Sequence, residues 1–145
     1  MDEGERAVLR FLDGRMLKGF LTGFSEQADE INLRDPESGK VSRVKTDELK
    51  AVFFVRTFEG DRKYDEKKCY GIRKPRGHRT FVKFRDGEDI IGFLEGAVPW
   101  EKGFFLDHHS MKGLKGFYLL PADDHSNNVR IFVFAAAVRD ATVVP

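Results

Sequence analysis

Residues 8–33 read VLRFLDGRMLKGFLTGFSEQADEINL, and residues 81–106 read FVKFRDGEDIIGFLEGAVPWEKGFFL. Aligned at a constant offset of 73 residues and without a gap, the two stretches share turn-forming and large apolar residues. The identical pairs are Phe11/Phe84, Asp13/Asp86, Gly14/Gly87, Gly19/Gly92, Phe20/Phe93, Leu21/Leu94, Gly23/Gly96 and Leu33/Leu106. Self-similarity in residues that specify turns and cores indicates an internal repeat.

Each copy has the pattern of a β-hairpin. Residues 8–11 alternate between apolar and polar faces as a strand does. Asp13-Gly14 and Asp86-Gly87 are the pairs favoured in two-residue type I′ turns, so we expect such turns here. Gly19 and Gly92 then fall inside the second strand of each copy, where glycine marks a sharp bend or a close backbone approach. We therefore expect strongly curved strands.

Three further elements follow in each copy. We expect a third strand around Ile31 and Leu33, matched in the second copy by Phe104 and Leu106. The first copy continues with a turn at 35–39, a strand at 40–45, a one-turn helix at 46–49 and a strand at 51–55. In the second copy these roles fall to residues 128–134, 135–137 and 142–144, and the longer insert at 107–127 has room for an extra strand at 116–120.

Five short antiparallel strands with a one-turn helix before the last are typical of an SH3-like barrel. We predict an all-β protein of two tandem five-stranded, strongly bent SH3/Sm-like barrels, each with a short one-turn helix. Residues 1–56 form the first barrel, 57–78 a polar basic linker, and 79–145 the second barrel with an inserted loop. Because each barrel is near the size at which one core is marginal, we expect the barrels to pack together or the protein to self-associate.

The first copy resembles the opening motif of Sm-like proteins. The matching residues are Leu9, Phe11, Asp13-Gly14-Arg15, Gly19, Leu21, Phe24 and Ile31-Asn32-Leu33. The resemblance implies a strongly bent five-stranded barrel, ring-like oligomers and RNA binding. The spacing of the family's RNA pocket and its second motif are not matched, so the resemblance carries the shape rather than the pocket. Residues 52–64 are also similar to uncharacterised bacterial proteins of this barrel type.

Composition excludes several classes of protein. The 145 residues carry a net charge of +1, which argues against a general polyanion binder. One Cys excludes an internal disulfide framework and fits a reducing compartment. No apolar run approaches the length of a membrane span, and the acidic start lacks the pattern of a secretory signal. We expect a cytoplasmic protein with no membrane association.

Residues 56–80 form the basic part of the chain, with nine Lys or Arg against four Asp or Glu. Clustered cations bind phosphates, and interleaved aromatic rings stack on unpaired bases. The candidate nucleic-acid contacts are Lys67, Lys68, Arg73, Lys74, Arg76 and Arg79. The alternative is a solvated linker without a ligand, because runs of charge are usually exposed.

Two polar clusters in the second copy contain metal-ligand residue types. The candidates are His108, His109, Asp123 and His125. Imidazole and carboxylate groups on facing loops could hold a divalent ion, but the spacing matches no known ligand motif, which favours a polar loop without metal. A metal-dependent activity of the second barrel is therefore kept as an alternative.

Aromatic residues supply candidates for contact with a partner. Trp100 follows Pro99 in a loop, and Phe53 and Phe58 lie in or just after the fifth strand. That strand is apolar on both faces, so the face away from its own barrel needs cover from the other barrel or another subunit. We find no catalytic constellation and no cofactor motif. The sequence thus predicts a non-enzymatic binding or assembly module that acts through barrel surfaces and strand edges.

Overall fold

The computed structural model describes residues 4–58, 78–94, 105–107, 114–122 and 127–144. These residues form one open, antiparallel sheet in the order β4-β3-β2-β1-β5-β10-β9-β7-β6-β11-β8. The only helices among them are two single 3₁₀ turns, η1 (Thr46–Glu48) and η3 (Ala135–Ala137). The all-β class predicted from the sequence is confirmed.

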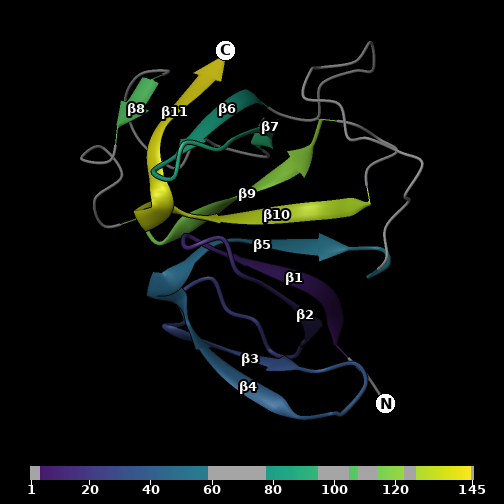
Figure 1. The fold of residues 1–145 in the computed structure, drawn as a ribbon. Coiled ribbons are helices and arrows are strands. Elements are labelled where there is room, and N and C mark those ends of the chain that lie inside the picture. Colours follow the sequence, from purple (N-terminus) through teal and green to yellow (C-terminus); the bar gives the residue numbers. More distant parts are fainter. Residues whose placement is uncertain (1–3, 59–77, 95–104, 108–113, 123–126, 145) are drawn as a thin grey trace.

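The strands fall into two groups along the chain. The first group is β1 (Glu5–Phe11), β2 (Met16–Leu21), β3 (Glu30–Arg34), β4 (Val41–Lys45) and β5 (Leu49–Val55). The second group is β6 (His78–Phe84), β7 (Asp89–Leu94), β8 (Phe105–Asp107), β9 (Gly116–Pro121), β10 (Asn128–Phe134) and β11 (Val138–Val144). Figure 1 shows the two groups one above the other, with β5 and β10 side by side where they meet.

The order β4-β3-β2-β1-β5 of the first group is followed in the sheet by β10-β9-β7-β6-β11. The registers correspond as well: Phe11 lies opposite Leu49, and Phe84, 73 residues later, lies opposite Val138. In both groups the register shifts just beside this pair, between β1 and β5 and between β6 and β11.

Strands are present at both places expected between residues 104 and 127, but β9, expected as an extra strand, is the one that lies between β7 and β10. β9 pairs with both β7 and β10, as β3 pairs with β2 and β4. Residues 105–107 form β8 instead, which pairs with β11 at the end of the sheet. The match of Leu33 with Leu106 is one of sequence, and long-range pairing determines which segment completes the sheet.

The hairpin turns also differ from the prediction. Gly14 has φ 94° and Gly87 has φ 93°, but no other residue type in the described chain has positive φ. The Gly14 N–H donates to the Phe11 carbonyl and the Phe11 N–H to the Arg15 carbonyl, at 3.1 and 3.0 Å. This is a three-residue loop whose glycine takes the left-handed position, and not a type I′ turn, which needs positive φ at two residues.

Two apolar cores hold the strands together, and each takes side chains from both groups. The core of the second group includes Val8 and Phe53 from the first, each 8% exposed. The core of the first group includes Phe132 and Phe134 from β10. As a result every residue of β5 is buried, which confirms that the second face of this strand is covered.

Candidate functional site

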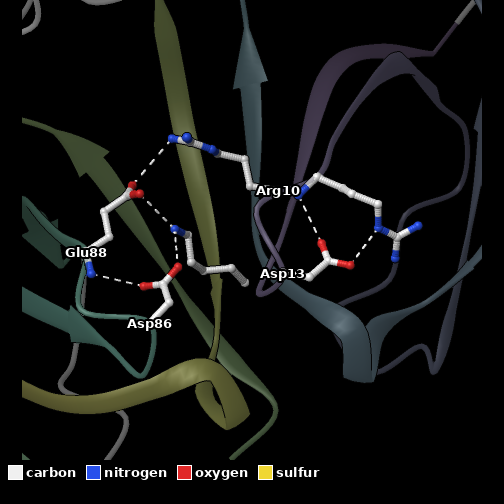
Figure 2. Close-up of polar contacts among 6 residues, drawn as sticks. Arg10, Asp13, Asp86 and Glu88 are labelled. Atoms are coloured by element: carbon white, nitrogen blue, oxygen red, sulfur yellow. Dashed lines mark hydrogen bonds and ion pairs between the residues drawn. The ribbon is translucent and has the colours of Figure 1, made fainter.

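A buried lysine joins the two groups of strands. Lys50 lies on β5 with only 3% of its side chain exposed, and its Nζ is 2.9 Å from Asp86 Oδ2 and 3.0 Å from Glu88 Oε2. Both carboxylates come from the turn between β6 and β7. Arg10 Nη1 reaches Glu88 Oε1 at 3.4 Å, so Glu88 lies between two cations (Figure 2).

The turn that carries Asp86 orients its carboxylate. The Glu88 N–H donates to Asp86 Oδ1 at 3.0 Å, which leaves Oδ2 for Lys50 (Figure 2). Burial raises the pKa of Asp86, but the hydrogen bonds from Lys50 and Glu88 and the charge of Lys50 lower it, with a net pKa below the ordinary value. Because Lys50 is buried and shared between two carboxylates, the arrangement suits a structural ion pair and not a nucleophile.

The equivalent turn of the first group is exposed and pairs with itself. Arg15 donates its N–H and its Nε to Asp13, at 2.9 and 2.7 Å, and both side chains are more than half exposed. Figure 2 shows Asp13 turned away from the Asp86 cluster. The same Asp-Gly turn therefore supports the junction in one copy and faces solvent in the other.

A second junction site lies around Arg130 on β10. Its guanidinium carbon lies 4.3 Å from the Phe54 ring centre and 5.1 Å from that of Tyr118, and Nη2 pairs with Glu5 Oε2 at 2.8 Å. A cleft of about 550 Å³ opens beside it, lined by Gly4, Glu5, Leu21, Thr22, Gly23, Phe24, Tyr118 and Arg130. Burial raises the pKa of Tyr118 above its ordinary value. The cleft is large enough for a small ligand, but its charged groups already satisfy each other.

The strand β4 forms one end of the sheet, and no strand of the described residues pairs with its outer edge. At the two ends of the β3–β4 ladder the Thr46 N–H donates to the Asp29 carbonyl at 2.9 Å and the Asp35 N–H to the Lys40 carbonyl at 2.8 Å. Because bonded pairs alternate along an antiparallel ladder, the backbone groups of Ser42 and Val44 also face β3. The backbone N–H and C=O groups that face outward are those of Val41, Arg43 and Lys45.

At the other end of the sheet, a short strand covers part of the edge and a hollow lies beside it. β8 pairs with residues 140–142 of β11. Beside β11 lies a hollow of about 330 Å³, lined by Phe81, Val82, Lys83, Asp89, Ile90, Ile91, Asp140 and Thr142. The Phe81 side chain is 46% exposed there, which is a large apolar exposure for a strand residue.

Most of the sequence-predicted site residues lie outside the described part of the chain. These are His108, His109, Asp123, His125, Lys67, Lys68, Arg73, Lys74, Arg76 and Trp100. Within the described ranges, no three His, Cys, Asp or Glu residues gather where they could hold a metal ion. No helix in those ranges is long and apolar enough to cross a membrane.

Three predicted contact residues are described. Arg79 is exposed on β6. Phe58 is partly buried and its ring packs edge-on against Phe20, with centroids 5.3 Å apart. Phe53 lies in the core between the two groups of strands. The structure brings none of these three together into one surface.

Sequence reasoning missed Lys50, Arg130 and the outward groups of β4. A signal for Lys50 was present, because one lysine interrupts the apolar run at 49–55 and a charge in a strand buried on both faces needs a partner. Arg130 and β4 carried no such signal, since their roles depend on which strands become neighbours.

The chain matches the model of a known protein family. A family of unknown function (DUF6982) matches residues 3–145, which is nearly the whole chain. No curated protein and no solved structure matches the chain.

Proposed function

The chain belongs to this family of unknown function, DUF6982, and we propose that it is a non-enzymatic binding or assembly module built from two copies of one five-stranded SH3/Sm-like unit. The repeated strand order and the corresponding registers support the duplication. At the junction, Lys50 pairs with Asp86 and Glu88, and Arg130 pairs with Glu5, which supports a scaffold rather than an acid–base site there.

The observation that carries the proposal is the pairing of β5 with β10. In the proposed duplication β10 corresponds to β4. The outer edge of β10 pairs with β5, so one edge of this kind already accepts a strand within the chain. The other edge of this kind, β4, has no neighbouring strand in the part of the chain that the structure describes. An open edge with outward N–H and C=O groups accepts an extended strand by main-chain hydrogen bonds. We place the docking site there.

β10 pairs with β5, and in the proposed duplication β11 corresponds to β5, so the experiment uses β11 as a peptide. A fluorescent peptide of residues 138–144, VRDATVV, is titrated with the full chain and followed by anisotropy. Saturable binding is expected for the wild type, with at least a tenfold loss in Arg43→Pro. This proline removes an outward N–H but no bond to β3, so the fold should persist, as circular dichroism would show.

Arg43→Thr is the matched control. It removes the same charge and the same ion pair with Glu30 but keeps the backbone N–H. Binding to this variant at the wild-type level would establish that the main chain makes the contact. Equal binding to the proline and threonine variants, or no binding to the wild type up to the solubility limit of the peptide, would overturn the proposal.

A further inference from the structure

The strand β8 occupies β11 in the register that β10 has on β5. An offset of 89 residues carries β5 onto β11, so that Ala51, Val52 and Phe53 correspond to Asp140, Ala141 and Thr142. On β5 the three opposite residues are Val133, Phe132 and Ile131; on β11 they are Asp107, Leu106 and Phe105. Both pairings are antiparallel. β8 therefore takes on β11 the place that β10 takes on β5. In the proposed repeat this is the place of the fourth strand of a following unit.

One face of the sheet beside β11 is more exposed than the corresponding face of the first group. Val8 on β1 corresponds to Phe81 on β6 at the offset of 73, and the two differ in burial: Val8 is 8% exposed and Phe81 is 46% exposed. The second group of strands covers Val8, whereas Phe81 lines the open hollow of about 330 Å³. Among the described residues, the β11 end thus lacks the cover that the second group gives to Val8 at the junction inside the chain.

The strand that fits this place on β11 is β4 of a second copy. By the register of the internal junction, Val44 would lie opposite Asp140, Arg43 opposite Ala141 and Ser42 opposite Thr142. Among the described strands, β4 is the one that holds in the first group the place that β10 holds in the second, so the internal junction assigns β4 to this position.

From these observations we infer that the β11 edge and the hollow beside it form a docking surface for β4 of a second copy, and that β8 is a guard strand that covers this edge within the chain. The inference rests on the proposed function, because it names the partner of the β4 edge. A head-to-tail contact of this kind leaves one free edge on each copy, so it forms rings where the rotation closes and open chains where it does not. The guard strand limits that growth, as natural proteins protect their sheet edges.

The first test removes the guard. The variant Phe105→Gly/Leu106→Pro/Asp107→Gly takes away the strand-forming residues of β8, and its mass is measured by light scattering over a range of concentrations. A concentration-dependent series of multiples of the chain mass is expected. Adding Arg43→Pro should return the variant to the mass of the wild type, because the β4 edge is then blocked. A folded variant that keeps the wild-type mass would overturn the inference.

The second test does not depend on the fold of that variant. In a Cys69→Ser background, Phe105→Cys and Thr142→Cys lie opposite each other, within the reach of a disulfide in an antiparallel pair. A labelled peptide of residues 39–46, GKVSRVKT, should bind the reduced chain and lose at least tenfold in affinity on oxidation, because the disulfide locks β8 onto β11.

The outcomes separate the two proposals. Equal binding of the peptide 39–46 to the reduced and oxidised chains, or no binding to the reduced chain, overturns the guard strand. The proposed docking edge of β4 is then tested only by binding of the peptide 138–144 to the wild type and to Arg43→Pro. Aggregation of the β8 variant that Arg43→Pro does not reverse also counts against head-to-tail pairing.

Discussion

Gly19 and Gly92 lie where a neighbouring strand passes too close for any side chain. A Cβ built on Gly19 would be 2.5 Å from the Arg34 carbonyl oxygen, and one on Gly92 would be 2.6 Å from that of Leu120. Neither glycine has positive φ. The sequence pattern allowed a bend or a close approach, and the close approach of β3 to β2 and of β9 to β7 is the reason that the structure supplies.

We expect Gly19→Ala to lower the free energy of unfolding by about 2 kcal/mol, since the new methyl group meets backbone that must shift. Gly23→Asn is the matched control: Gly23 has φ 66° with nothing near its Cβ position, and Asn tolerates this conformation. Its effect should stay within about 0.5 kcal/mol. Urea denaturation measures both values. Equal losses in the two variants would contradict the close-approach explanation.

The pairing of Asp86 with Lys50 predicts a pH dependence of stability. The pKa of Asp86 is lowered in the folded state, so its contribution is present above the unfolded-state pKa of about 3.9 and is lost as the pH falls through the folded-state value. Asp86→Asn should cost about 3 kcal/mol at neutral pH, because Lys50 then keeps a buried charge with one carboxylate. The difference from the wild type, measured by urea denaturation, should shrink below about pH 4.

Lys50→Met is the control for this ion pair. A methionine of similar size leaves no buried charge, so the loss should be about 1 kcal/mol or less. In a Lys50→Met background, Asp86→Asn should have little further effect at any pH. If the difference in the free energy of unfolding between Asp86→Asn and the wild type is the same from neutral to acidic pH, the carboxylate acts through packing and not through its charge.

At the scale of the elements, local signals placed most strands. The alternation and Asp-Gly loops predicted β1, β2, β6 and β7. β10 and η3 fall on the expected 128–134 and 135–137, whereas β11 begins at Val138 and not at the expected residue 142. These elements are specified by residues close in sequence: period-two burial in β6, and glycine at the loop position that needs positive φ.

The sequence predicted strands around 104–106 and at 116–120, but not which of the two lies between β7 and β10. Residues 104–106 continue the sequence alignment, whereas β9, in which every second residue is buried, lies between β7 and β10. The choice between the two segments depends on pairing with β7 and β10, which come from different parts of the chain. The insert at 107–127 breaks the constant offset of 73 residues, and sequence similarity alone does not show where the structural correspondence ends.

β4 and β10 show why an edge cannot be identified from one copy. They hold corresponding places in the sheet, yet Arg43 and Lys45 of β4 stand where β10 has Phe132 and Phe134. The aromatic pair lies in the core, with ring centres 5.1 Å apart, whereas the cationic pair is exposed at the end of the sheet. Lysine and arginine on an edge strand oppose uncontrolled pairing, so the polar version fits the open end.

At the scale of the whole molecule, the two groups of strands depend on each other. Val8 and Phe53 complete the core of the second group, and Phe132 and Phe134 complete that of the first. Burial of one such side chain contributes about 1.5–3 kcal/mol, a large part of the stability of a small domain. The Lys50 cluster and the Arg130–Glu5 pair add ionic contacts at the same junction.

This exchange of core residues predicts that neither group folds alone. Expressed separately, residues 1–58 and 78–145 should self-associate or lack a cooperative thermal transition, because each exposes a strand face that the other normally buries. Mixed in equal amounts, they should form a one-to-one complex with cooperative unfolding, followed by circular dichroism and light scattering. Asp86→Ala in the second fragment, which leaves Lys50 without one partner, should weaken that complex at least tenfold. A monomeric, cooperatively unfolding 1–58 fragment would instead show two independent domains, and would remove the internal junction as a template for contacts between copies.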